Sequence, residues 1–281
     1  MKELRLTDSL MEAYATFLQE AEYATATVRK YARDLRALKA YLKGAPITKA
    51  ALIGWKQQLM ETHTPASINS MLAAANSLLM WLEQQNLCVK PLKIQKSLFL
   101  DEKKALSRQD YCRLVKAAEK AENRRLSLAM QTICSTGIRV SELKFITVEA
   151  VRRGRAEIQN KGKLRTVFLP KKLCRLLQTY IRREKKTAGA VFTTRTGRPL
   201  DRSNIWRDMK ALCQSAGVDP EKVFPHNLRH LFARTYYALQ KDMTKLADIL
   251  GHSSINTTRI YTAETGANHA RQIGSLALVI T

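Results

Sequence analysis

The sequence predicts a mainly α-helical protein of two domains, with a small antiparallel β-sheet in the second. Three observations favour this fold class. The chain has 281 residues, enough for two domains of ordinary size. Apolar residues recur at steps of three and four over most of the chain, as in amphipathic helices. Two short β-like runs flank a tight turn after residue 154. We therefore expect an N-terminal four-helix bundle followed by a C-terminal α+β domain.

Residues 1–86 are predicted to form the helical bundle. The clearest stripe lies in residues 27–42, where Val28, Leu35 and Leu42 fall on one face. Similar stripes run through residues 6–20, 48–61 and 65–85. Helices of this length joined by short loops pack as a small bundle.

Residues 87–104 are predicted to be a basic linker between the domains. The segment contains Pro91 and is rich in lysine, with no clear apolar period. A linker of this length spans on the order of 20–60 Å. A plain surface connection explains the same composition equally well.

The second domain is predicted to cover residues 105–281, with Ser107 as the N-cap of its first helix. The runs 155–159 and 165–169 are the predicted strands, joined by the turn Asn160-Lys-Gly-Lys163. Helices are predicted over residues 108–119, 123–136, 171–184, 203–216, 226–239 and 242–250.

The charge of the chain indicates a polyanionic partner. Lys and Arg number 48 against 24 Asp and Glu, a formal net charge of +24. Such an excess favours nucleic acid first and an anionic membrane second. The longest apolar stretch, residues 71–82, is interrupted by Asn76 and Ser77. It is shorter than the ~20 residues that span a bilayer, so we expect no membrane partner. Five cations are candidate DNA contacts: Arg29, Lys30, Arg33 and Arg36 on the predicted second helix, and Lys163 in the turn between the predicted strands.

Cysteine usage and the N-terminus both favour a cytoplasmic protein. The five cysteines are odd in number and contain no C-x-x-C pair, which argues against a disulfide framework or a cysteine zinc site. The first residues are charged and show no signal peptide.

Four of the five histidines lie in the last 56 residues, and a metal site explains them poorly. His226 and His230 have the i, i+4 spacing of two zinc ligands, but no glutamate stands between them, and Arg229 opposes a metal. A two-metal nuclease needs clustered carboxylates, and the acidic residues here are scattered. We therefore expect no metal and no cofactor.

An anion site explains these residues better. His226 opens a predicted helix, where free backbone N–H groups favour a phosphate, and Arg229 lies on the same face. Arg139 and His252 each follow a helix-ending glycine closely. Tyr261, nine residues after His252, is a possible nucleophile.

These residues stand in motifs that resemble, in order, those of the tyrosine recombinases, the family of lambda-type integrases and Xer-type recombinases. The bundle resembles the core-binding domain of that family through residues 27–35 and 68–82. The resemblance covers nearly the whole chain. The motifs are Thr136-Gly-Ile-Arg-Val-Ser-Glu-Leu143, Asn160-Lys-Gly-Lys163, His226-Asn-Leu-Arg-His230, Leu250-Gly-His-Ser-Ser254 and Thr257-Thr-Arg-Ile-Tyr-Thr262.

The resemblance implies a role for each motif position around a scissile DNA phosphate. Tyr261 would attack the phosphorus and become linked to a DNA 3′ end. Arg139 and Arg229 would bind the non-bridging oxygens, where charge develops. His252 would donate a further hydrogen bond to the phosphate, and His226 would serve in acid–base transfer.

Three more residues complete the implied site. Lys161 would protonate the leaving 5′ oxygen, and Lys163 in the same turn is the alternative. Glu142 would orient the neighbouring arginine or histidine from behind.

The resemblance also implies how the enzyme works on DNA. A phosphotyrosine retains the energy of the phosphodiester, so neither ATP nor a metal is needed. The implied assembly is a homo-tetramer on two double-stranded DNA sites that exchanges strands through a four-way Holliday junction, with a DNA-bending accessory protein as a further partner. The apolar tail, residues 266–281, would dock on a neighbouring subunit, or else close its own domain. We expect the minimal, Xer-like form without an arm-binding domain.

Two hypotheses from different classes follow. The first is a site-specific recombinase, within which an integrase of a mobile element, a resolvase and an invertase are not separated by the sequence. The second is a DNA-binding protein of the same fold that has lost catalysis. Such a protein would lack at least one of the six implied catalytic residues, and all six are present here.

Overall fold

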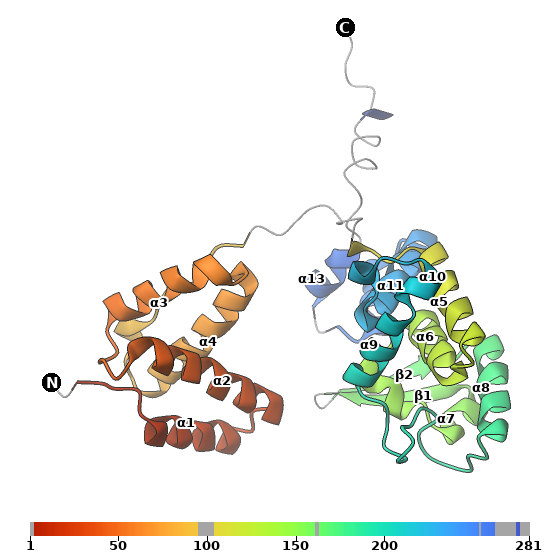
Figure 1. Ribbon diagram of the computed structural model, residues 1–281, viewed down its shortest axis with the longest axis horizontal. Coiled ribbons are helices and arrows are strands. Elements are labelled where there is room, and N and C mark those ends of the chain that lie inside the picture. Colours follow the sequence, from red (N-terminus) through yellow and green to blue (C-terminus); the bar gives the residue numbers. More distant parts are fainter. Residues whose placement is uncertain (1–2, 95–103, 161–162, 253, 262–273, 276–281) are drawn as a thin grey trace, which may run out of the picture. The chain divides into compact units, whose positions relative to one another are not determined.

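The structure is a computed structural model that describes residues 3–94, 104–160, 163–252, 254–261 and 274–275. The chain divides into two compact units, residues 1–96 and 97–281. Figure 1 shows helices in both units and the β-hairpin in the second. The predicted fold class, mainly helical with a small antiparallel sheet, is confirmed.

The first unit is a bundle of four α-helices followed by a short 3₁₀ helix. Three of the α-helices begin at a threonine whose hydroxyl accepts a hydrogen bond from the backbone three residues later, namely Thr7, Thr48 and Thr64. The first helix therefore starts two residues later than its apolar stripe. The elements are α1 (Asp8–Glu20), α2 (Thr25–Leu42), α3 (Lys49–Thr62), α4 (Pro65–Trp81) and η1 (Gln85–Leu87).

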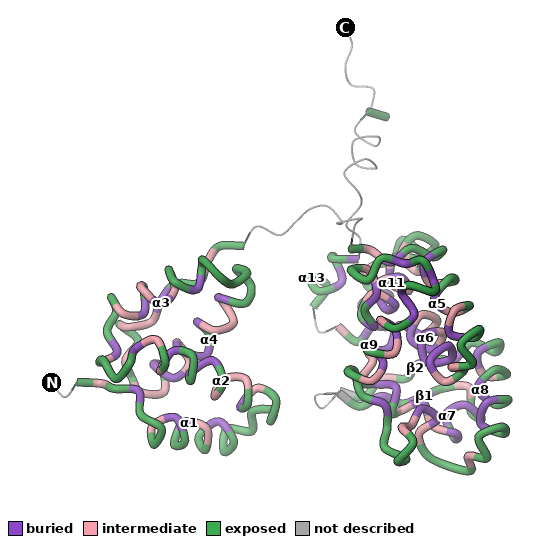
Figure 2. Tube along the Cα trace, viewed as in Figure 1, coloured by how far each residue is buried: buried purple, intermediate pink, exposed green. Residues whose placement is uncertain are grey.

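The core of the first unit contains the apolar stripes of all four helices. Tyr14, Leu35, Trp55 and Leu78 are each at most 2% exposed. Figure 2 shows these inward faces as buried segments along the bundle. Lys30 on α2 also joins two helices, because its ammonium group binds Asp34 and the carbonyl of Ser70 on α4.

The segment after η1 stays on the bundle rather than leaving it at residue 87, where the predicted linker begins. Val89 is buried, and its backbone forms two hydrogen bonds with the side-chain amide of Asn76. Asn69 holds the backbone of Leu92 in the same way. Sequence periodicity misses this because single asparagines on α4, and not an apolar stripe, fix the segment.

The second unit begins with a capping box between Ser107 and Asp110, as the sequence predicts for its first helix. Its elements are α5 (Arg108–Lys120), α6 (Arg124–Thr136), η3 (Val140–Phe145), α7 (Val148–Arg153), β1 (Arg155–Asn160), β2 (Lys163–Phe168), α8 (Lys171–Arg183), α9 (Arg202–Ala211), α10 (Cys213–Ala216), η4 (Pro220–Lys222), α11 (Pro225–Gln240), α12 (Met243–Leu250), α13 (Ile255–Thr258) and η5 (Arg259–Tyr261).

Helix α6 is the central element of this unit. It contacts α5, α8, α9 and α11, and side chains on several of its faces are buried. Met130 and Ile133 are fully buried at the centre of the apolar core. Gly137 ends the helix in a left-handed conformation, with φ of 68°. A helix held this firmly is a rigid base for the residues that follow it.

The hairpin pairs β1 with β2 in antiparallel register, with Arg155 opposite Phe168 and Asn160 opposite Lys163. The sequence predicts both strands, each displaced by at most two residues. One face packs on the unit, with Ile158 and Val167 buried, while Leu164 and Phe168 are exposed.

Several local features differ from the sequence-based prediction, among them η3, α7 and η4, over which no helix is predicted. The helix expected over residues 203–216 is interrupted at Leu212, which separates α9 from α10. The short elements α13 and η5, which carry Tyr261, were not predicted because a single turn leaves no apolar period.

Candidate active site

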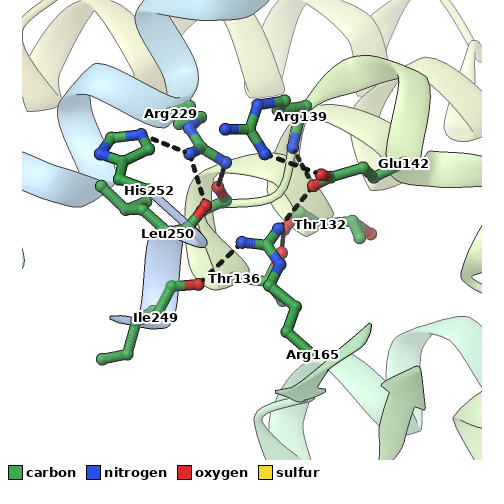
Figure 3. Close-up of polar contacts among 10 residues, drawn as sticks. Thr132, Thr136, Arg139, Glu142, Arg165, Arg229, Ile249, Leu250 and His252 are labelled. Carbon is green, nitrogen blue, oxygen red and sulfur yellow. Dashed lines mark hydrogen bonds and ion pairs between the residues drawn. The ribbon is translucent and has the colours of Figure 1, made fainter. Parts of the chain in front are cut away.

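The candidate site forms where the loop after α6, helix α11, the end of α12 and strand β2 meet. Arg229 on α11 lies at its centre and is only 1% exposed. Figure 3 shows its guanidinium facing the other polar residues of the site. It donates to the carbonyls of Gly137 at 2.7 Å and Leu250 at 2.8 Å.

Those two carbonyls end helices α6 and α12, which explains why a buried cation is stable there. Helix C-termini carry partial negative charge and unpaired carbonyl groups. Burial and the charge of Arg139 lower the pKa of Arg229 to about 10, while Tyr261 acts in the opposite direction through charge and a side-chain hydrogen bond. The guanidinium is therefore still a cation at neutral pH.

A buried carboxylate holds two further arginines beside this centre. Glu142 is 2% exposed and accepts hydrogen bonds from the side chain of Arg139 at 3.0 Å and its backbone N–H at 2.8 Å. It also accepts one from Arg165 on β2 at 2.6 Å. Glu142 thus contacts Arg139 directly, as a carboxylate that orients this arginine would. The side chain of Arg139 is 34% exposed.

His252 is neutral and held by hydrogen bonds at both ring nitrogens. Its Nε2 lies 2.9 Å from Arg229 and its Nδ1 lies 2.9 Å from the hydroxyl of Thr258. An arginine only donates, so Nε2 is the acceptor and Nδ1 carries the proton. Burial and the arginines Arg229, Arg139 and Arg165 lower the pKa of His252 to about 4.

Tyr261 is buried, at 4% exposure, within an apolar cluster that includes Leu246 and Leu250. Its ring lies parallel to that of His252, with centroids 5.9 Å apart, and edge-on to that of His230 at 4.8 Å. The nucleophile candidate is therefore placed by ring contacts.

His230 and His226 lie one turn apart on α11, with ring centroids 4.2 Å apart. His226 is exposed at the start of the helix. Partial desolvation and the charge of Arg229 lower the pKa of His226. Burial and the neighbouring His226 lower the pKa of His230 to about 3, and its Nε2 has no hydrogen-bond partner among the described residues.

The structure thus brings together most of the residues singled out in the sequence. They are Arg139, Glu142, His226, Arg229, His252 and Tyr261. Lys161 and the side chain of Lys163 lie outside the described residues, as do nearly all of residues 266–281.

Two residues of the site were missed by sequence reasoning. Arg165 binds Glu142 and the carbonyl of Ile249, and Thr258 binds His252. A charged residue at a core-facing position of a predicted strand was the available signal for Arg165. Thr258 had none, because a buried threonine is unremarkable in sequence.

The predicted cations of α2 have different environments. Lys30 and Arg33 both pair with the buried Asp34, with Arg33 at 3.1 Å. Arg29 and Arg36 are exposed. Lys30 therefore acts at least in part as a structural link within the bundle.

Within the described part of the chain, no group of three His, Cys, Asp or Glu side chains is placed to hold a metal ion. No helix of that part has both the length and the apolar character needed to cross a bilayer.

A buried arginine, a partly exposed arginine, neutral histidines and a tyrosine lie together here, and they define a class of protein whose site suits an anionic group such as a phosphate. Comparison with known proteins agrees with this class. The model of the phage integrase family matches residues 104–267, and that of the phage integrase N-terminal SAM-like domain matches residues 11–86. The chain therefore belongs to the phage integrase family and is a site-specific tyrosine recombinase, an enzyme that cleaves and exchanges DNA strands.

Similar proteins and structures are consistent with that assignment. Tyrosine recombinase XerA of Pyrococcus furiosus is 27% identical over 97% of this chain and 95% of its own. Tyrosine recombinase XerD of Vibrio cholerae is 32% identical over 47% of each chain. The structure of a lambda integrase dimer bound to a COC′ core site is 19% identical, with a TM-score of 0.76 over 94% of this chain and 97% of that chain. These likenesses support the two-domain fold.

Proposed function

We propose that the chain recombines DNA with Tyr261 as its nucleophile. The observation that carries this proposal is the position of Tyr261, whose ring contacts His230 and His252 and whose hydroxyl interacts electrostatically with the Arg229 guanidinium. A phenol is a weak nucleophile, and an adjacent base together with nearby cations activates it for attack on phosphorus. In the reaction a bond forms between the tyrosine oxygen and phosphorus, and the bond from phosphorus to the 5′ oxygen breaks.

Arg139 and Arg229 bind the non-bridging oxygens of the scissile phosphate in this proposal. Arg139 is one-third exposed and fixed by Glu142, so its guanidinium is accessible to DNA and already oriented. Preorganised cations of this kind stabilise the charge that develops in the transition state. His252, beside Arg229, completes the phosphate site.

Proton transfer needs a base for the phenol and an acid for the leaving group. His226 is exposed at the start of α11, and its lowered pKa keeps it neutral and able to accept the proton of Tyr261. Lys161 supplies the proton to the leaving 5′ oxygen, and Lys163 is the alternative. The 3′-phosphotyrosyl product keeps the phosphodiester energy, so a 5′ hydroxyl of another strand reverses the reaction without ATP or a metal.

The assembly that performs strand exchange is a tetramer of this chain on paired sites in double-stranded DNA. The net charge of +24 supports DNA as the partner. A solved lambda integrase tetramer bound to a Holliday junction has a TM-score of 0.74 with this chain, which supports the same architecture. We infer that the tail, residues 266–281, docks on a neighbouring subunit, that a DNA-bending protein assists, and that the enzyme acts on nucleoid DNA in the cytoplasm.

Covalent capture tests the proposed nucleophile. Purified protein is mixed with labelled duplex DNA from the ends of the genetic element that encodes it, and the products are separated on a denaturing gel. We expect a slowly migrating adduct with the wild type and with Tyr236→Phe, and none with Tyr261→Phe. Tyr236 is a matched control, because it packs against the same apolar cluster.

Each alternative has its own result. An adduct that persists in Tyr261→Phe contradicts the proposed nucleophile. Tight, salt-sensitive DNA binding without any adduct, on substrates that contain the mapped recombination site, favours a binding protein that has lost catalysis.

DNA with sulfur in place of the bridging 5′ oxygen distinguishes Lys161 from Lys163 as the general acid, because a thiolate leaves without protonation. Of variants that lack Lys161 or Lys163, only the one that lacks the true general acid regains cleavage on that substrate.

A further inference from the structure

Arg165 occupies a strand position where an apolar side chain is expected. Neighbouring Leu164 and Phe168 point outward from β2, while Val167 is buried on the same face as Arg165. Its cross-strand partner Ile158 is fully buried. The side chain of Arg165 is only 15% exposed. A cation in such a place needs compensating partners.

Its first partner is the carboxylate that orients Arg139. Arg165 donates to Oε2 of Glu142 at 2.6 Å, the same oxygen that accepts the backbone N–H of Arg139 at 2.8 Å. The other carboxylate oxygen accepts the side chain of Arg139 at 3.0 Å. Arg165 therefore fixes the plane of the carboxylate on which Arg139 depends.

Its second partner is the turn that carries His252. Arg165 donates to the carbonyl of Ile249 at 3.0 Å, one residue before the Leu250 carbonyl that Arg229 holds. The side chain also covers Gly251, where a Cβ atom would lie 2.8 Å from its guanidinium. Figure 3 shows Arg165 extending from the strand to both partners.

We infer that Arg165 is a positioning residue of the recombination reaction, which sets the orientation of Arg139 through Glu142 and that of His252 through the end of α12. Arg165 thereby connects strand β2 to the two groups that it positions, Arg139 and His252. Its guanidinium is largely buried and already bonded to two groups, so it acts through Arg139 and His252 and not by touching DNA. This inference rests on the proposed function.

Single-turnover cleavage at saturating DNA tests the inference, with DNA affinity and thermal unfolding measured on the same proteins. The test variants are Arg165→Gln and Arg165→Lys. Arg155→Gln is the matched control, since it removes one positive charge from the exposed side of the same hairpin. We expect a cleavage rate constant about 10- to 100-fold lower in Arg165→Gln, because a displacement of about 1 Å in a reacting group has an effect of this order.

Three further results are expected if Arg165 positions the phosphate site. The DNA affinity of Arg165→Gln falls no more than the DNA affinity of Arg155→Gln. Arg165→Lys stays slow, because one ammonium cannot hold both partners with the geometry of a guanidinium. Arg165→Gln combined with Glu142→Gln is no slower than the slower single variant, since the two residues act as one unit.

A purely structural role gives a different pattern and overturns the inference. Fewer molecules would be folded, so the amplitude of cleavage would fall while its rate constant matched that of Arg155→Gln. Recovery of the Arg165→Gln rate on the 5′-sulfur DNA would also overturn it, because the defect would then lie in leaving-group protonation. If the wild type forms no adduct that depends on Tyr261, the proposed function itself is wrong.

Discussion

Arg229 donates to Nε2 of His252, at 2.9 Å, so this nitrogen bears no proton in the DNA-free protein. The histidine is therefore a neutral acceptor toward the site and a donor toward Thr258. To donate a hydrogen bond to a phosphate from Nε2, it must gain a proton or change tautomer when DNA binds. The anionic phosphate itself favours that change, since it offsets the arginine charges that lower the pKa of His252.

We predict that His252 of the free protein is neutral and protonated on Nδ1 at pH 6. Its pKa of about 4 leaves it uncharged there, whereas an ordinary histidine is mostly protonated. Long-range ¹H–¹⁵N NMR distinguishes the two tautomers from the cation, and His252→Asn assigns the signal. A cationic ring, or a proton on Nε2, would contradict the arrangement with Arg229.

A second prediction concerns stability in mild acid. His230 and His252 have pKa values of about 3 and about 4 when folded, below the ordinary 6.5. As the pH falls below 6.5, the unfolded chain binds protons that the folded chain does not. The free energy of unfolding should therefore decrease, by at most about 1.4 kcal/mol per pH unit for each histidine.

Urea unfolding at pH 7.5 and pH 5.5 measures this effect in a range where carboxylates remain largely ionised. The pH dependence should be weaker in His230→Phe, which removes one of the two partly buried titrating groups. Equal or greater stability of the wild type at pH 5.5 would show that these histidines are not held neutral.

Much of the site could be predicted from sequence because its residues have local signals. Arg139 follows the glycine that ends α6, and His252 follows the glycine that ends α12, so each occupies a recognisable helix end. Their approach to Arg229 depends on how α6, α11 and α12 pack. The sequence pattern alone does not contain that packing. The family resemblance nevertheless implied that these residues gather around one phosphate.

The residues that sequence reasoning missed are those defined only by distant partners. Arg165 contacts groups 23 and 84 residues away in the chain, and those contacts fix its role. Val89 shows the same limit in the first unit, where Asn76 holds a segment whose composition indicates a linker. Lys30 was a candidate DNA contact by charge alone, and its bond to the buried Asp34 appears only in three dimensions.

A third prediction compares two glycines. Both Gly137 and Gly154 end helices with positive φ, of 68° and 71°. A Cβ atom at Gly137 would lie 2.4 Å from the ring of Phe232, whereas one at Gly154 would meet nothing within 4 Å. Gly154→Ala should lower the free energy of unfolding by about 1–2 kcal/mol through backbone strain. Gly137→Ala should lower it by roughly 1–3 kcal/mol more, because the ring must move.

Chemical denaturation of the two alanine variants gives the comparison directly. Gly137→Ala should also slow DNA cleavage, because the Gly137 carbonyl accepts a hydrogen bond from Arg229. Equal losses of stability in the two variants would mean that the contact with Phe232 relaxes without cost.

A final prediction separates two cations of α2. Arg36 is exposed, whereas Lys30 binds the buried Asp34 and the Ser70 carbonyl. Arg36→Gln should weaken DNA binding and lower the slope of log affinity against log salt by about 1, as the loss of one phosphate contact does. Lys30→Gln should instead lower the free energy of unfolding by about 1–3 kcal/mol, since Asp34 loses a charged hydrogen-bond partner.

Fluorescence anisotropy over a salt series and denaturation of both variants test this division. Arg33 remains beside Asp34 in Lys30→Gln, so the bundle should still fold and its DNA affinity is measurable. Arg36→Gln should unfold like the wild type, because its side chain is exposed on the helix surface. If Lys30→Gln lowers the salt slope without loss of stability, the lysine exchanges Asp34 for a DNA phosphate when the complex forms.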